Sequence, residues 1–581
     1  MVSSDKRFYP PMAGNDLYTY SDHVNYKEQS VTLLSNTNYS KAQLIKNNSL
    51  IMEKYFRCIE GLGTELNSLF QEDLTPNFWK KSLSLAFKRY LSILHMAFIE
   101  FSHFDKKEYK IYAVLSQDCY FIPEDFEDQR EFLQNTDLGR EQLFSIYIST
   151  FHSDIFESAV KIRVNLNRAE NASILSTVKF NFLRIKAICS RENVQVRVGV
   201  LDSFFSKENS RKLTKNRHIS TLYIKNIRSK HSLSSKRTSL GSSFEVTDLF
   251  DNYYKKSLQS LFPRFFIENF EINKKHYISE IEMYPSLKYI ICEAWISSTR
   301  DSFILALAKE NKNVLHVYSE HNSLFHPFLG NNTELTASMV DTYYTIGWES
   351  DRIGSDIDVS NIKSGASLFF QEPISKRIPD KGQFLFMDVA TFGYLEEYNT
   401  YYSESDFFSK YYFQFLKDFF SELSGNLKTT ITYREYPVGG RNWKTYDNKV
   451  ILKEYLPSNL IIDDMGFSGH EMMIKSELNI IPYTNTAYIQ SLILDIPTIF
   501  FWNKSVAHLH GSYLDFFDVL IDVGICQTSP REAAKFLCSI EHDVQGWWLN
   551  EDTKLARKLF LSKNIKNPDN AFDFYNSLAN F

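Results

Sequence analysis

Hydrophobic residues recur at helical spacing near the start of the chain. From about residue 51 to 110, apolar positions lie three or four residues apart, as in Leu62, Leu66, Leu69 and Phe70. This period places apolar side chains on one face of a helix. The sequence therefore predicts amphipathic helices that pack on a core, preceded by about 50 polar, weakly periodic residues.

After residue 110 the pattern changes to short apolar, β-branched or aromatic runs separated by helical segments. The predicted strands are Lys110 to Leu115, Val194 to Leu201, Tyr289 to Trp295, Val314 to Ser319, Thr342 to Gly347, Phe384 to Val389, Thr429 to Tyr433, Leu478 to Tyr483, Thr498 to Phe501 and Val519 to Asp522. Alternating strands and helices over this length predict parallel sheets covered on both faces.

Two segments are predicted to be boundaries. Residues 207–237 hold ten Lys or Arg and one acid, which is typical of a solvated loop or of a basic face toward anionic lipid or a phosphate-bearing acceptor. Lys225, Arg228 and Lys230 are the candidate contacts there. The second segment, Gln371 to Lys381, carries two prolines and resembles an interdomain linker. We therefore expect one domain over 1–375, a second over 376–545, and a helix over 546–581 that packs back across both.

Composition narrows the class of protein. The chain has 581 residues, 43% hydrophobic and 23% charged, which is typical of folded globular proteins. A net charge of -5 makes a general nucleic-acid binder a poor fit. The six cysteines are scattered without a CxxC pair, so neither a disulfide framework nor a zinc site is expected. We find no signal peptide and no run of about 18 apolar residues, and we expect a reducing, cytoplasmic location.

The most informative segment runs from Leu478 to Trp502. A predicted strand ends at Tyr483, a polar turn of Thr484, Asn485 and Thr486 follows, and a short helix then leads to the next strand. A strand, turn and helix N-terminus of this kind presents N–H donors that bind phosphate. An ordinary helix cap is the alternative interpretation.

A second segment, Thr430 to Arg441, delivers Arg434 at the end of a predicted strand. A guanidinium keeps its charge and binds phosphate with two parallel hydrogen bonds. Because both segments lie at the same edge of one parallel sheet, we expect Arg434 and the threonine turn to face one ligand. A surface arginine in a turn is the alternative.

A third segment, His316 to Gly330, places Glu320, His321 and His326 after a predicted strand. A carboxylate beside an imidazole is a candidate pair for general acid and base catalysis, whereas each histidine alone is also consistent with a structural role. No HExxH pattern occurs, so no metal is expected, and Asp463-Asp464 is interpreted as a strand-end turn.

Taken together, these segments resemble a family of transferases encoded in bacterial O-antigen and surface-polysaccharide loci. More distantly, they resemble GT-B transferases that use CMP-activated Kdo or nonulosonic acids. The matching motifs are Arg434-Glu435-Tyr436-Pro437, the turn from Tyr483 to Thr486, Ile496-Pro497-Thr498 with Trp502, and Trp547-Trp548. The family's Gln-His-Gly-Gly loop corresponds to Glu320-His321-Asn322-Ser323, and its Trp-Gly-Trp to Ile346-Gly347-Trp348.

The resemblance implies an α/β GT-B architecture, in which two Rossmann-like domains with parallel sheets face a central cleft. The second domain would hold the nucleotide sugar and the first the acceptor, with neither metal nor cofactor. The nucleotide-binding residues implied are Arg434, Tyr436, Pro437, Tyr483, Thr484, Asn485, Thr486 and Gln490. Glu320 or His321 would act as the base, and Arg434 with the helix at Thr484 would stabilise the departing phosphate.

The expected function is transfer of a sugar, a Kdo- or pseudaminic-acid-like residue activated by CMP, onto a surface glycan or lipid-linked acceptor of lipopolysaccharide or capsule synthesis. One alternative is a nucleotide-sugar epimerase, which would use the same phosphate site. Another is a non-catalytic assembly protein that docks on the inner face of the membrane through the basic segment 207–237.

Overall fold

The computed structural model describes residues 41–102, 113–135, 137–163, 196–201, 205, 207–222, 224–225, 232–293, 298–320, 324, 326–328, 332–349, 360–368, 379–389, 398, 406–423, 427–436, 448–457, 460–484, 486–502, 504, 508–566 and 568–580. It begins with two long helices, α1 (Lys41–Phe70) and α2 (Pro76–Phe101). The Thr75 hydroxyl caps α2 by accepting from the Phe78 N–H at 3.1 Å, and Pro76 occupies the first turn. The helices predicted from the periodicity are thus confirmed.

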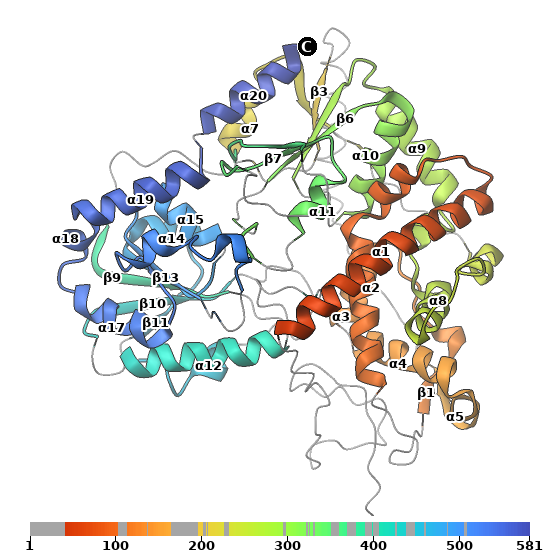
Figure 1. Ribbon diagram of the computed structural model, residues 1–581, viewed down its shortest axis with the longest axis horizontal. Coiled ribbons are helices and arrows are strands. Elements are labelled where there is room, and N and C mark those ends of the chain that lie inside the picture. The colour runs from red at the N-terminus through yellow and green to blue at the C-terminus, as the bar shows by residue number, and fades with distance from the viewer. Residues whose placement is uncertain are drawn as a thin grey trace, which may run out of the picture.

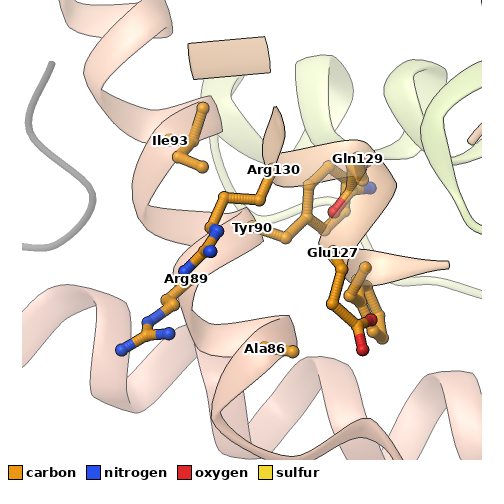
Figure 2. Close-up of a pocket in the computed structure, with 8 residues that line it drawn as sticks. Ala86, Arg89, Tyr90, Ile93, Glu127, Gln129 and Arg130 are labelled. Carbon is orange, nitrogen blue, oxygen red and sulfur yellow. The ribbon is translucent and has the colours of Figure 1, made fainter. Parts of the chain in front are cut away.

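Further helices and two short strands complete this helical part. They are β1 (Ala113–Leu115), α3 (Phe126–Asn135), α4 (Asp137–Phe151), α5 (Ser153–Ser158), β2 (Val160–Ile162), α8 (Leu249–Leu261) and α9 (Phe270–Glu282). A small pocket lies between α2 and α3, with Tyr90, Arg89 and Arg130 among its lining side chains (Figure 2). It contains none of the residues that the sequence predicts for a site.

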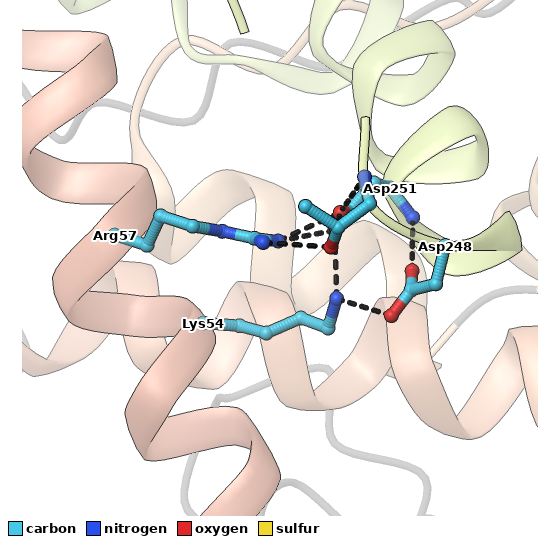
Figure 3. Close-up of polar contacts among 5 residues, drawn as sticks. Lys54, Arg57, Asp248 and Asp251 are labelled. Carbon is cyan, nitrogen blue, oxygen red and sulfur yellow. Dashed lines mark hydrogen bonds and ion pairs between the residues drawn. The ribbon is translucent and has the colours of Figure 1, made fainter. Parts of the chain in front are cut away.

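A buried ion network joins α1 to α8 (Figure 3). Asp251, whose side chain is fully buried, accepts hydrogen bonds from Lys54 at 2.8 Å and from Arg57 at 2.7 Å. Lys54 also contacts Asp248, whose second oxygen caps α8. Each cation therefore has a carboxylate partner, which offsets the cost of burying the charges.

The first sheet has six parallel strands in the order β4-β3-β5-β6-β7-β8. Their bounds are β3 (Val198–Val200), β4 (Ile219–Thr221), β5 (Tyr289–Cys292), β6 (Leu315–Ser319), β7 (Thr342–Tyr344) and β8 (Ile362–Lys363), with helices α7 (Lys207–Leu213), α10 (Thr299–Lys312) and α11 (Thr333–Ala337) between them. Alternate residues face opposite layers: Ile290 and Cys292 join the core around α2 and α10, whereas Ile291 packs with Tyr575 of the last helix.

The second sheet is also six-stranded and parallel, in the order β11-β10-β9-β12-β13-β14. The strands are β9 (Asp380–Met387), β10 (Thr430–Arg434), β11 (Leu460–Ile462), β12 (Ser476–Ile481), β13 (Thr498–Phe501) and β14 (Cys526–Gln527). Its helices are α12 (Asp406–Leu423), α13 (Asn448–Leu452), α14 (Gly469–Lys475), α15 (Thr486–Ile493), α16 (Asp518–Ile521), α17 (Pro530–Ile540) and α18 (Val544–Trp548). Phe384 and Phe386 pack toward α12, whereas Leu385 packs toward α14.

The α/β fold class predicted from the sequence, with two Rossmann-like domains that each contain a parallel sheet, is confirmed (Figure 1). The first sheet's last strand ends at Lys363 and the second sheet's first strand begins at Asp380. No helix among the described residues is long and apolar enough to cross a membrane.

Two predictions about local structure are wrong. The run from Val519 to Asp522 forms helix α16 instead of a strand, and the strand follows at Cys526 after Gly524, whose φ of 81° ends the turn. A short apolar run does not separate buried helix from strand by periodicity alone. The segment 207–237 contains α7, β4 and a 3-10 turn in place of one long loop, because Leu213 and Ile219 enter the core.

The C-terminal helices cross from the second domain to the first. Helix α19 (Glu551–Asn564) packs on α15 and α16, and α20 (Pro568–Asn580) then covers the first sheet. In α20, Ala571, Tyr575 and Ala579 face that sheet, and the Tyr575 hydroxyl donates to Ser319 Oγ at 2.8 Å. The end of the chain therefore ties the two domains together.

We expect Asp251→Asn to destabilise the helical part by about 3 kcal/mol, because it leaves Lys54 and Arg57 without their shared counter-charge. Asp248→Asn is the matched control: its side chain is 47% exposed, and Asn is an equally good helix cap. Urea unfolding followed by circular dichroism measures both. Equal small changes in the two variants would show that the network contributes little.

Candidate functional site

The carboxyl edge of the second sheet gathers polar side chains from three neighbouring strands. Arg434 is the last residue of β10, and Asp463 follows β11 directly. Their side chains form an ion pair in which both are at most 6% exposed. The Arg434 Nη1 makes this contact, and a guanidinium carries four more N–H donors in a fixed plane. Asp463 therefore orients a cation at the edge where ligands of open α/β sheets bind.

His470 joins this edge and was not predicted from the sequence. It is the second residue of α14, and a Cβ placed on its neighbour Gly469 would lie 3.6 Å from Arg434 Nε. Its Nδ1 lies 2.7 Å from Gln490 Nε2 on α15. The amide nitrogen only donates, so Nδ1 accepts and the neutral ring carries its proton on Nε2. Burial lowers the pKa of His470, which favours this neutral form.

His470 thus contacts Gln490 of the predicted nucleotide site, and its neighbour Gly469 lies close to Arg434 of the same predicted site. The sequence does show the Ser468 and Glu471 capping box that starts α14. The sequence does not show the contact between His470 and Gln490, because this contact depends on how α14 and α15 pack against the same sheet.

A buried carboxylate lies at the end of β9, between the two predicted phosphate segments. Asp388 accepts hydrogen bonds from the hydroxyls of Tyr412 and Tyr433 and, at 2.8 Å, from Asn448 Nδ2. Burial raises its pKa, and these hydrogen bonds act in the opposite direction. Asp388 therefore serves to lock the ends of β9 and β10 to α12 and α13.

The predicted nucleotide residues differ in exposure. Tyr483 and Thr484 follow β12; Thr484 is buried, and the pKa of Tyr483 is raised by burial and then by Asp388 and Tyr436. Tyr436 is 46% exposed. Thr486 is the first residue of α15, as the predicted turn and helix require. Pro437 and Asn485 lie outside the described residues.

Glu320 follows β6 at the carboxyl edge of the first sheet. Its Oε2 accepts from Trp348 Nε1 at 2.6 Å and from the Ile346 N–H at 3.1 Å, and the Tyr343 hydroxyl lies 3.4 Å from Oε1. Burial raises the pKa of Glu320 to about 8. That value suits proton transfer near neutral pH. The carboxyl group is enclosed, however, so contact with a substrate would require Trp348 to move away.

His326 connects Glu320 to the second domain. Its ring stacks on Trp348 with centroids 4.0 Å apart, and its other neighbours are Tyr513 and Phe516 from the loop after β13. Burial lowers the pKa of His326. The histidine therefore packs as a neutral ring where the two domains touch. His321 lies outside the described residues.

Of the three basic residues predicted as acceptor or membrane contacts, the structure describes Lys225. Lys225 has an exposed side chain, and its carbonyl accepts from His276 Nε2 at 2.8 Å. Arg228 and Lys230 lie outside the part of the chain that the structure describes. Within that part, no group of three or more His, Cys, Asp or Glu side chains is arranged to hold a metal ion.

The chain thus folds into two Rossmann-like domains, and polar side chains gather at the carboxyl edge of the sheet in the second domain. The model of the LIC12162 family transferases matches residues 7–574, and the chain belongs to that family. It is thus a member of a transferase family. No curated protein matches the chain.

The chain is also similar, at low sequence identity, to several solved structures. A wall teichoic acid polymerase, TagF, is 11% identical with a TM-score of 0.31 over 70% of this chain and 98% of its own. A glycosyltransferase from Rickettsia africae is 10% identical with a TM-score of 0.38 over 66% and 98%. The glycosyltransferase VinC, solved with dTDP, is 9% identical with a TM-score of 0.32 over 66% and 100%.

We expect Glu320 to make the protein less stable as the pH rises from about 4.5 to about 8. Its pKa is about 8 in the folded state against 4.5 for the free group, so the folded state keeps a proton that the unfolded state releases in this window. The slope for one proton is about 1.4 kcal/mol per pH unit.

Glu320→Gln keeps the shape but cannot ionise, so this part of the pH dependence disappears in the variant. Thermal unfolding midpoints measured from pH 5 to 8 test this expectation. If the curves of thermal midpoint against pH run parallel for the native protein and Glu320→Gln, the carboxyl group of Glu320 titrates normally and is not enclosed.

Proposed function

We propose that this protein is a glycosyltransferase that binds a nucleotide sugar at the carboxyl edge of its second sheet. The donor is a CMP-activated ulosonic or nonulosonic acid, and the acceptor is a surface glycan or lipid-linked saccharide. The single observation that carries the proposal is the convergence of Arg434, His470 and Gln490 with the start of α15 at that edge.

The chemistry of this edge fits a phosphate. Arg434 supplies a permanent positive charge, and α15 points the positive end of its dipole outward from the sheet. The neutral His470 adds an Nε2–H donor. In sugar transfer the bond between the anomeric carbon and the donor phosphate breaks, so negative charge grows on the phosphate. Donors held in place against such charge each lower the barrier by about 3 kcal/mol.

The nucleotide itself also requires an apolar or aromatic contact. Tyr436 is half-exposed and follows Arg434 by two residues in the sequence, at the same end of β10. An exposed aromatic ring next to a cation suits a base or ribose stacked above a bound phosphate. Glu320 and His321 belong to the acceptor side of the proposal, where one of them removes the proton of the attacking hydroxyl.

We expect Arg434→Gln to weaken nucleotide binding at least about tenfold, since a charge-assisted hydrogen bond to phosphate contributes about 1.5 to 3 kcal/mol. Asp463→Asn is the matched control, because it neutralises the other half of the ion pair and leaves the guanidinium available to the ligand. Calorimetric titration with CMP, UDP and GDP, side by side, measures the affinities.

The control variant Asp463→Asn should bind nucleotide at least as tightly as the native protein. Equal losses in both variants, with equal drops in thermal midpoint, would mean that the ion pair only maintains the fold. A preference for UDP or GDP would contradict only the proposal that the donor sugar is activated by CMP.

We expect His470→Ala to weaken binding several-fold without changing the thermal midpoint, because the ring is only partly buried and its partner Gln490 is also partly exposed. His542→Ala is the control, since its side chain is 76% exposed on a different helix end. Release of free nucleotide in the presence of acceptor glycan provides the second readout. Unchanged affinity and turnover in His470→Ala would remove this residue from the site.

A further inference from the structure

Helix α19 presents an unusual outward face. Its inner face, which includes Ala556 and Phe560, packs on the second domain, where Phe560 contacts Phe516 and Phe517. Leu555 and Leu559 point outward and are 55% and 43% exposed. Residues four apart lie on the same side of a helix, so the two leucines form one apolar stripe.

Lysines flank this stripe on both sides. Lys554 and Lys558 lie on one side of the two leucines around the helix, and Lys563 lies on the other. From Thr553 to Lys566 the chain has five basic residues and no acidic one, although the whole protein carries a net charge of -5. Glu551 and Asp552 are confined to the first turn, where acids stabilise a helix N-terminus.

A second basic segment lies along the same margin of the molecule. Helix α20 follows α19 directly and packs beside α7, and Figure 1 shows the three helices along one side. Asn216, just after α7, donates to Asn576 of α20 at 2.8 Å. The exposed basic side chains of this segment are Arg211, Lys212, Lys215 and Arg217.

From these observations we propose that α19 is a membrane-docking helix, which lies on an anionic lipid surface with Leu555 and Leu559 in the headgroup layer. A helix with a short apolar stripe and lysines on its borders matches such a surface in both polarity and charge. An acidic protein partner would not require the exposed leucines, and a second copy of this helix would bring lysines against lysines. The proposal concerns the outward face of α19, where none of the proposed nucleotide-binding residues lies, and does not rest on the proposed function.

Vesicle flotation of the full-length protein tests the proposal. One set of vesicles is pure phosphatidylcholine, and the other contains phosphatidylglycerol as well. We expect binding to the anionic vesicles alone, which weakens as salt is raised. Lys558→Gln with Lys563→Gln should reduce this binding by about tenfold or more. In Leu555→Gln with Leu559→Gln, the part of the binding to anionic vesicles that persists at high salt should disappear.

The matched control is Leu249→Gln with Lys535→Gln, which changes an exposed leucine, 63% accessible, and an exposed lysine on other helices. It should float like the native protein. Because all these side chains point to solvent, thermal midpoints should stay constant and show that each variant is folded. The proposal is overturned if the native protein does not float with anionic vesicles, or if both α19 variants float as it does. It is also overturned if Leu555→Gln with Leu559→Gln changes the self-association of the protein and leaves its flotation with vesicles unchanged.

Discussion

The geometry of the parallel sheets determines where the residues of the proposed phosphate site lie. Each strand must return through a crossover, so every strand of a sheet ends at the same edge. In the second domain this constraint brings Arg434, Asp463 and the turn before α15 to one edge, although Arg434 and the turn are about fifty residues apart in sequence. The Arg434–Asp463 pair then fixes a cation there. The proposed phosphate site follows from the order of the strands.

Among the described residues, side-chain packing and a short backbone bridge from Phe328 to Leu509 connect the two domains. His326 lies between Trp348 of the first domain and Tyr513 of the second, and Trp348 in turn donates to Glu320. The C-terminal helices form the second connection, because α19 packs on one domain and α20 on the other. A movement of one domain relative to the other would therefore act directly on the hydrogen bonds that enclose Glu320.

The sequence predicts the periodic parts of this fold well. The leucine spacing that marks α1 and α2 and the aliphatic run of β12 are local signals with a direct physical cause. The pairing of Arg434 with Asp463 and the approach of His470 to Gln490 are not local, because they depend on strand order and helix packing. Short strands such as β4 and β8, with two or three residues, are too brief to give a periodic signal.

Hydrogen–deuterium exchange with and without CMP tests the central claim most directly. The account predicts slower exchange of backbone amides at the end of β10, the start of α14 and the start of α15, all at the carboxyl edge of the second sheet. The first sheet should be unaffected except near Trp348, where the domains touch. Protection confined to the first domain, or none at nucleotide concentrations that saturate calorimetric binding, would contradict it.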